Sequence, residues 1–166
     1  MKRKVLQKFN NSKLCIVCGM SNDLGLKARF YELEGGELLG VCHTREEHQS
    51  YPGRMHGGMS AALLDETMGR AMNIKDPDGF GVTLSLQTVY RKPVPLDATI
   101  YCLGRITKDT RRIFEASGEI LLEDGTVLVE ATGRYLKMPI EQISDESVED
   151  MEYRLYEGGD LEEIDL

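Results

Sequence analysis

The chain has 166 residues, a length typical of one domain, and its 41% hydrophobic content is that of an ordinary globular protein. No stretch approaches the roughly 18 consecutive apolar residues of a membrane span, and no apolar segment follows the basic start Met1–Lys4, as a signal peptide requires. The net charge of −8 comes without a concentrated basic face, which argues against nucleic-acid binding. We therefore expect a cytoplasmic chain without membrane contact.

In chain order, the sequence predicts two strands joined at Gly35-Gly36, one helix, and four further strands separated by turns. Asp76-Pro77-Asp78-Gly79 ends the helix, and Asp124-Gly125 joins the last two strands. This order favours an α+β fold, an antiparallel sheet with one long helix packed on it. The expected helix is Gly57–Asn73, and the expected strands are Leu26–Leu33, Glu37–Thr44, Val82–Tyr90, Thr99–Thr107, Arg112–Leu122 and Thr126–Lys137.

Acidic residues gather at one end of the chain. From Glu141 onward there are eleven Asp and Glu residues and one basic residue, Arg154, so the rest of the chain is nearly neutral. Such a segment is most simply solvated, although a short docked helix is an equal alternative, because three apolar residues share helical spacing: Val148, Met151 and Leu155. We expect three parts: an N-terminal turn or short helix at 1–22, the folded domain at 23–139 and an acidic tail at 140–166.

The four cysteines do not resemble the disulfide framework of a small secreted protein. Cys15 and Cys18 form a single C-x-x-C pair, which could be half of a zinc site completed by Cys42 and His43, or a redox pair. A structural zinc site needs four ligands, and no second pair with ligand spacing supplies them. We therefore expect a buried N-terminal turn without metal.

The segment from His56 to Met72 is apolar on nearly every side, which indicates a buried helix. Two acids interrupt it. Glu66 has an ion-pair partner four residues later in Arg70, whereas Asp65 has only small residues at that spacing. A carboxylate in a buried setting is costly unless it is paired or hydrogen-bonded, so we predict that Asp65 is functional.

The start of the same helix also has the chemistry of a site. Gly57-Gly58 lets a ligand approach backbone N–H groups that lack partners within the helix, which suits a developing oxyanion. Gly57 and Asp65 are separated by about 12 Å along the axis, at ~1.5 Å per residue. Because one helix cannot present both groups to one carbonyl, we expect a homodimer with composite sites.

At these residues the chain resembles hotdog-fold acyl-CoA thioesterases of the phenylacetate-degradation (PaaI-like) type. The resemblance spans roughly residues 15–138. It rests on His56-Gly57-Gly58 with Asp65 nine positions after the His, and on three further stretches: Cys15-Ile16-Val17-Cys18-Gly19, Tyr51-Pro52-Gly53-Arg54-Met55, and Val82-Thr83-Leu84 through Tyr90-Arg91-Lys92-Pro93-Val94-Pro95. It implies a hotdog fold, dimers or dimers of dimers (homotetramers), and thioester hydrolysis without metal or cofactor.

The resemblance also implies roles for single residues. Asp65 would be the base or nucleophile, the Gly57 N–H the oxyanion donor, and Thr83 a hydrogen-bond partner of the attacking group. His56 would hold the helix tip or the thioester. Several relatives have an Asn six residues before this His, where this chain has Ser50 preceded by Gln49. The further candidates for substrate binding are Gly58, Arg54, Arg91 and Lys92.

The activity predicted is therefore acyl-CoA thioester hydrolysis. Two alternatives remain at this point. A hotdog hydratase or dehydratase would act on the same thioesters, and a non-catalytic acyl-CoA-binding protein would hold them without turnover. The release of free thiol from a thioester distinguishes the first activity from the other two.

Overall fold

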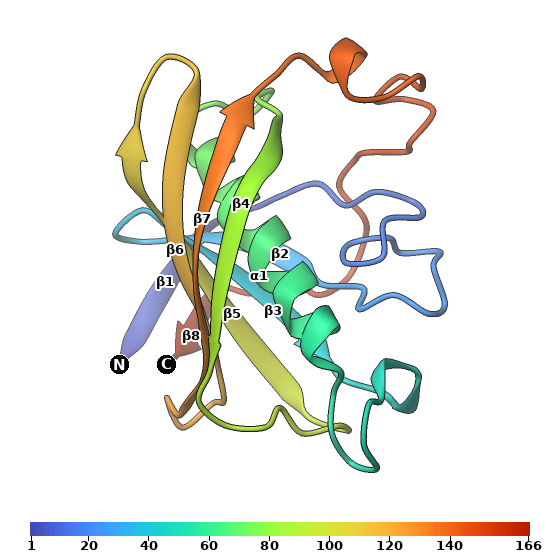
Figure 1. Cartoon of the computed structure of the whole chain (residues 1–166), viewed down its shortest axis with the longest axis vertical. Coiled ribbons are helices and arrows are strands. Elements are labelled where there is room, and N and C mark those ends of the chain that lie inside the picture. The colour runs from blue at the N-terminus through green and yellow to red at the C-terminus, as the bar shows by residue number, and fades with distance from the viewer.

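Eight strands form one antiparallel sheet, and a single long helix, α1, crosses one of its faces (Figure 1). The computed structural model describes residues 1–166. The strand order is β4-β7-β6-β5-β3-β2-β1-β8, so β4 and β8 are the two edges of the sheet. The elements are β1 Lys2–Lys8, β2 Arg29–Leu33, β3 Glu37–His43, α1 Gly57–Arg70, β4 Gly81–Tyr90, β5 Thr99–Asp109, β6 Ile113–Leu121, β7 Val127–Lys137 and β8 Glu163–Asp165.

This arrangement confirms the predicted α+β hotdog fold. The hairpin at Gly35-Gly36 joins β2 to β3, and both glycines have the positive φ angles that such a turn needs. The four strands after the helix begin and end within about two residues of their expected bounds, as is usual for boundaries read from sequence. The helix is shorter than expected, because Ala71–Ile74 continue it as a 3₁₀ turn.

One face of α1 is buried against the sheet. Leu63, Leu64 and Met68 are fully buried in the main core, and Thr67 is buried beside them. The sheet approaches closely here, since a Cβ at Gly104 would lie only 2.9 Å from the Thr67 carbonyl oxygen. The opposite side of the helix stays partly open: Gly58, Ala61, Ala62, Asp65 and Gly69. The helix expected to be buried all round is therefore buried on one side within a single chain.

The N-terminal segment corrects an expectation. Lys2–Lys8 form β1, which lies between β2 and β8, where the sequence suggested a turn or a short helix within residues 1–22. A polar strand of this kind has no local signal, because its partner β8 lies more than 150 residues further along the chain.

The acidic tail lies against the rest of the chain without forming a helix at Val148–Leu155, while nearly all of its acidic side chains stay exposed. Its last strand, β8, pairs with β1, and Arg154 pairs with Asn11. Acidic side chains of the tail meet lysines of the N-terminal segment, with Lys2 at 2.5 Å from Glu163 and Lys8 at 3.0 Å from Asp160. These ion pairs are largely exposed and contribute little. The apolar tail residues Leu161, Ile164 and Leu166 pack against the smaller core cluster, so apolar burial and strand pairing hold the tail in place.

The edge strand β4 contains a β-bulge. Thr83 is opposite Tyr135 of β7, but the next paired residue is Ser85, so Leu84 is an extra residue in the strand. Only one side of β4 has a neighbouring strand within the chain.

No helix combines the length and the apolar composition that crossing a bilayer would require.

Candidate active site

The carboxylate of Asp65 projects from the side of α1 that the sheet leaves partly open. The Thr83 hydroxyl lies 2.9 Å from Oδ1 and 3.0 Å from Oδ2 of Asp65. The Tyr135 hydroxyl lies 3.2 Å from Oδ1 and 3.1 Å from the backbone oxygen of Asp65. Two neutral hydroxyl donors therefore orient the carboxylate, and its negative charge is not neutralised by a basic partner in this group.

The sheet register positions both donors. Thr83 on β4 is directly opposite Tyr135 on β7, and the Tyr135 ring stacks on Phe114 with their centroids 4.9 Å apart. Burial and the neighbouring Asp65 carboxylate raise the pKa of Tyr135 above its ordinary value. The phenol therefore keeps its proton and can donate to Asp65 at any physiological pH.

Asp65 borders a pocket of about 320 Å³ between α1, the start of β4 and the C-terminal segment. This volume is at the lower end of the range for small-molecule sites. The pocket extends along the helix from Asp65 past Gly69, and a Cβ at Gly69 would lie 3.4 Å from the Tyr135 ring. Apolar side chains from several elements complete its walls: Met72, Phe80, Ile140, Met151 and Tyr153.

A second group of predicted residues lies at the start of α1. His56 is the N-cap, and its Nδ1 accepts a 2.8 Å hydrogen bond from the Gly58 N–H, so this side chain holds the helix tip. The Tyr90 hydroxyl donates to the Gly57 carbonyl oxygen at 2.7 Å. The Gly57 N–H remains an unpaired donor at the positive end of the helix.

Two loops meet beside this tip. The Met55 N–H donates to the Val94 carbonyl oxygen at 2.9 Å, and Arg54 is paired with Pro95, which brings the segment before α1 against the segment after β4. These loops gather the remaining predicted binding residues, all of them exposed: Gln49, Ser50, Arg54, Arg91 and Lys92. Arg91 is paired with Glu130 at 2.7 Å. Gln49 and Ser50 are adjacent and both exposed, so both remain candidates for the position of the relatives' Asn.

The predicted site residues therefore form two groups within one chain. Asp65 lies in the second half of α1, and Thr83 contacts it from β4. His56, Gly57 and the loop residues lie at the start of the helix. The helix geometry keeps the two groups about 12 Å apart along the axis.

The C-x-x-C pair meets a partner that sequence reasoning missed. The Cys15 thiol donates to Glu66 Oε2 at 3.0 Å, and Cys15 Sγ, Cys18 Sγ and a Glu66 oxygen all lie within 4.8 Å of one another. The proposed completion by Cys42 and His43 is wrong, because neither belongs to this cluster; Cys42 is buried in the core and His43 is exposed beside Asp97.

The charges in this cluster are unusual. The Cys18 thiol beside it lowers the pKa of Cys15, and burial raises the pKa of the Glu66 carboxyl to about 8. The predicted pairing of Glu66 with Arg70 is loose, with 3.9 Å between Oε1 and Nη1, and Nη1 of Arg70 is buried without a hydrogen-bond partner.

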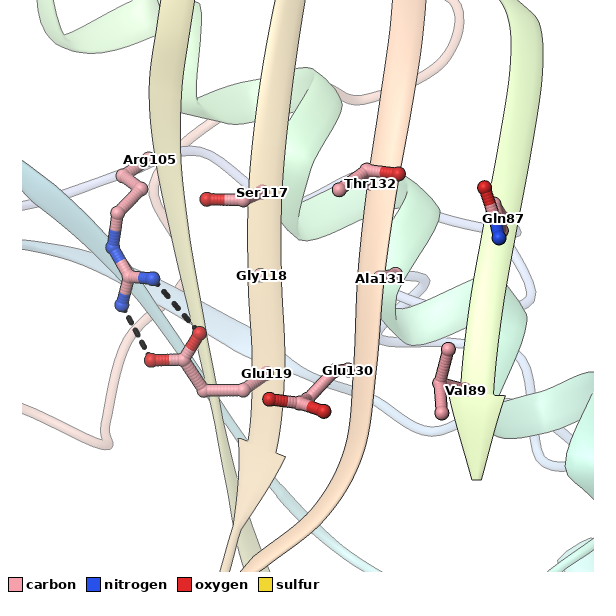
Figure 2. A pocket seen from close by; sticks show the side chains of 9 residues that line it. All are labelled: Gln87, Val89, Arg105, Ser117, Gly118, Glu119, Glu130, Ala131 and Thr132. Atoms are coloured by element: carbon pink, nitrogen blue, oxygen red, sulfur yellow. Dashed lines mark hydrogen bonds and ion pairs between the residues drawn. The ribbon is translucent and has the colours of Figure 1, made fainter. Parts of the chain in front are cut away.

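A different hollow lies on the outer face of the sheet, away from α1 (Figure 2). Figure 2 shows the Arg105 guanidinium paired with both oxygens of Glu119, at 2.8 and 2.5 Å, and Arg105 also contacts Glu37. The acid across from them, Glu130, is paired with Arg91. Because the charged groups of this surface already have partners, it is not the candidate site.

Tyr135 and Tyr90 are the site residues that sequence reasoning missed. They contact Asp65 and Gly57 across separations of 70 and 33 residues, so no local spacing links them to the helix. Only Tyr135 has a feature in the sequence that could have indicated its position, which is Gly133 two residues before it. A Cβ at Gly133 would lie 2.6 Å from the Tyr135 hydroxyl oxygen. A small residue two positions before a strand tyrosine leaves its ring room on the same face of the sheet.

Comparison with known proteins agrees with the fold. Residues 52–129 match the family model of the thioesterase superfamily. The acyl-coenzyme A thioesterase THEM4 of Mus musculus is 28% identical over 116 residues, which cover 69% of this chain and 49% of that protein. Acyl-coenzyme A thioesterase 13 of Homo sapiens is 26% identical over 102 residues, or 61% of this chain and 72% of the relative. The chain thus spans about half the length of THEM4.

Solved structures give the same result. A thioesterase superfamily protein known from a crystal structure is 31% identical with a TM-score of 0.66, covering 74% of this chain and 59% of that one. A mutant of the phenylacetic acid degradation protein PaaI from Thermus thermophilus is 25% identical with a TM-score of 0.55, covering 62% of this chain and 86% of that one.

The long helix on an antiparallel sheet defines a hotdog fold, and its candidate site combines a hydroxyl-held carboxylate in mid-helix with a glycine tip at the helix start. Over residues 52–129 the chain is similar to the thioesterase superfamily, and its fold matches that of a crystallised member of that superfamily.

Proposed function

We propose that this protein is an acyl-CoA thioesterase that hydrolyses a CoA thioester to a free acid and CoA. One observation carries the proposal: the Asp65 carboxylate is held by Thr83 and Tyr135 at the edge of a pocket large enough for a small acyl group. Two hydroxyl donors fix the direction of this carboxylate, and a general base or a nucleophile needs such a fixed position. The named activity of THEM4 and of thioesterase 13 supports the same assignment.

In the proposed reaction, Asp65 takes a proton from a water molecule whose oxygen attacks the thioester carbonyl carbon. The carbonyl electron pair moves onto oxygen, where the Gly57 N–H at the positive end of a helix stabilises the negative charge. The carbon–sulfur bond then breaks, and CoA leaves as a thiol with the proton that Asp65 held. Direct attack by Asp65, followed by hydrolysis of the resulting anhydride, uses the same groups in the same positions.

The site is proposed to be composite, with Asp65 and Thr83 from one chain and Gly57 and His56 from the other chain of a homodimer. The axial separation of about 12 Å prevents one helix from supplying both groups. Two features support a partner at this surface: the open side of α1 is lined by small residues, and the edge of β4 has no neighbour within the chain. A twofold axis would bring each helix tip to the other chain's carboxylate. A pair of such dimers is compatible with the same proposal.

The CoA moiety is proposed to lie over the loops beside the helix tip. Arg54, Arg91 and Lys92 are exposed there and could meet its phosphates, with Arg91 leaving its contact with Glu130. Gln49 or Ser50 would bind the thioester or the attacking water, and Gly58 would give the substrate close access to the backbone. These assignments leave the acyl group to the pocket beside Asp65.

A panel of CoA thioesters read by thiol release tests the proposal. We expect turnover with at least one thioester, and we expect Asp65→Asn to lower kcat by at least ~10²-fold without loss of structure. Glu123→Gln, which changes an exposed acid far from α1, is the matched control and should leave the rate unchanged. Binding without any thiol release would favour the acyl-CoA-binding alternative, and hydration of an enoyl thioester would favour the hydratase.

A further inference from the structure

A second cluster of reactive side chains lies next to Asp65 but takes no part in the proposed hydrolysis. Cys15 and Cys18 belong to the N-terminal segment, and Glu66 follows Asp65 on α1. Successive helix residues point in directions about 100° apart, so Asp65 and Glu66 face different surroundings. Cys18 and Glu66 also line the far part of the pocket that Asp65 borders.

We propose that Cys15, Cys18 and Glu66 bind a zinc ion that fastens the N-terminal segment to α1. Thiolate sulfur and carboxylate oxygen are among the ligands that zinc takes in proteins, and C-x-x-C is a common spacing for two of them. The proposal reverses the expectation of a metal-free turn, which rested on the absence of further ligands near the pair in sequence. The third ligand comes from 51 residues further along the chain.

The backbone around Cys15 is already shaped to stabilise a thiolate. The N–H groups of Val17 and Cys18 point at Cys15 Sγ, at 3.4 and 3.5 Å. The chain then turns tightly, with the Gly19 N–H donating to the Cys15 carbonyl oxygen at 2.8 Å. A Cβ at Gly19 would lie 2.3 Å from that oxygen, so only glycine fits after the second cysteine. Donors aimed at the sulfur favour its charged form, which is the form that binds metal.

The distances leave room for an ion. With Zn–S near 2.3 Å and Zn–O near 2.0 Å, tetrahedral ligand atoms lie about 3.5–3.8 Å apart. The three ligand atoms of the cluster lie within 4.8 Å of one another, and Cys15 Sγ is 3.0 Å from Glu66 Oε2. Side-chain shifts of under about an ångström therefore convert the thiol–carboxylate contact into a coordination shell. The cluster supplies three of the four ligands, so water would take the fourth position, as it does at zinc sites with three protein ligands.

The charges balance around such an ion. Two thiolates and one carboxylate carry three negative charges, which a zinc dication and the Arg70 guanidinium together neutralise. Glu66 presents Oε2 to the sulfurs and Oε1 to Nη1 of Arg70, 3.9 Å away, so the carboxylate can bind the ion through one oxygen and face Arg70 with the other. Arg70 is itself fixed over Phe30 at 4.5 Å and by the Tyr153 hydroxyl at 2.7 Å, as outer-shell partners of metal ligands usually are.

Cobalt and zinc titrations of the reduced, metal-free protein test this site. We expect one Co²⁺ per chain, with the thiolate-to-cobalt charge-transfer absorption of a cysteine-ligated ion, displaced by Zn²⁺. Cys15→Ser and Cys18→Ser should lose that absorption and weaken binding by more than the ~100-fold that loss of an outer-shell partner can reach. Cys42→Ala, which removes a buried cysteine outside the cluster, should bind as the wild type does.

A second measurement remains decisive where a variant does not fold. In the wild type, Zn²⁺ should protect Cys15 and Cys18 from alkylation by a maleimide, as mapped by mass spectrometry. The proposal is overturned if the reduced wild type takes up no Co²⁺, if its thiols react equally with and without Zn²⁺, or if Cys15→Ser binds Co²⁺ as the wild type does. A Cys15–Cys18 disulfide that forms in air, with no metal uptake after reduction, would identify a redox pair instead. None of these readouts depends on thioester turnover.

Discussion

Thr83 on β4 stands directly opposite Tyr135 on β7, and the hydroxyls of both residues point at the same carboxylate, that of Asp65. A cross-strand pair is a rigid way to fix two donors, because the sheet hydrogen bonds set the separation of the two side chains. The helix supplies the acid and the sheet supplies its orientation. The relative position of α1 and the β4–β7 edge therefore controls the candidate site.

Removing either hydroxyl should lower turnover with little effect on substrate binding. A hydrogen bond to a charged group contributes about 1.5–3 kcal/mol, so we expect Thr83→Val and Tyr135→Phe each to reduce kcat roughly 10- to 100-fold. Val keeps the branched shape suited to a strand, and Phe keeps the stack on Phe114. Steady-state kinetics on the best thioester measures the effect.

Thr88→Val is the control for this pair of variants, because it makes the same change on the same strand away from Asp65. A Thr83→Val enzyme as active as Thr88→Val would mean that the contact is structural only.

His56 gives a test that separates its two possible roles. Its Nδ1 caps the helix by accepting from the Gly58 N–H. His56→Ala should cost about 1 kcal/mol of unfolding free energy, whereas His56→Asn, a good N-cap, should recover most of it. If His56 acts only by holding the tip, Asn also restores kcat. Urea unfolding and kinetics on the same three proteins give the answer, and a stable but inactive His56→Asn would show that the ring contacts the thioester.

The composite site predicts complementation between two inactive parents. Asp65→Asn removes the acid, and Gly57→Val places a branched side chain where even a Cβ would lie 3.3 Å from the Tyr90 ring, closing the helix tip. In a mixed dimer one site collects both changes and the other has neither. Random pairing should therefore recover roughly a quarter of wild-type activity, assuming independent sites.

Sedimentation and circular dichroism would first establish that both parents fold and dimerise. Purified mixed dimers with no more activity than either parent would rule out a site shared between chains.

The stability of the fold should fall in mild acid because of His48. This side chain is 1% exposed; its Nδ1 accepts the Arg45 N–H at 3.0 Å, and its Nε2 lies 3.1 Å from the Gly25 carbonyl oxygen. Burial lowers the pKa of His48 below its ordinary value of 6.5. The unfolded chain therefore binds a proton before the native state does, and stability present above 6.5 is lost as the pH falls through the lowered value.

Urea unfolding at about pH 7.5 and about pH 5.5 measures this loss. His48→Gln, which can offer an acceptor and a donor but does not titrate, should show a smaller difference between the two pH values. An equal loss in both proteins would assign the acid sensitivity to other groups.

Local pattern was enough for the parts of this molecule whose determinants are close in sequence. The Gly35-Gly36 hairpin, the start of α1 and the last four strands each depend on residues a few positions apart, and they were predictable. Asp65 was recognisable as a candidate because the helix offers it no charged neighbour at i±4.

The parts that depend on distant pairing were not predictable. The strand β1 exists because β2 and β8 flank it, and the tail docks through its pairing with β1 and through Leu161, Ile164 and Leu166, which pack against the core. In the same way, Glu66 meets Cys15 and Asp65 meets Tyr135 only once the sheet has formed. A single sequence carries no record of which distant side chains the fold brings together.

The extra residue at Leu84 determines which side chains of β4 face α1. Thr83 and Tyr90 both reach toward α1, one to Asp65 and the other to Gly57, yet they are seven positions apart. In a regular strand an odd separation puts two side chains on opposite faces. The bulge between Thr83 and Ser85 shifts the alternation by one residue and returns Tyr90 to the face of Thr83. Without Leu84, β4 could direct Thr83 toward Asp65 or Tyr90 toward Gly57, but not both.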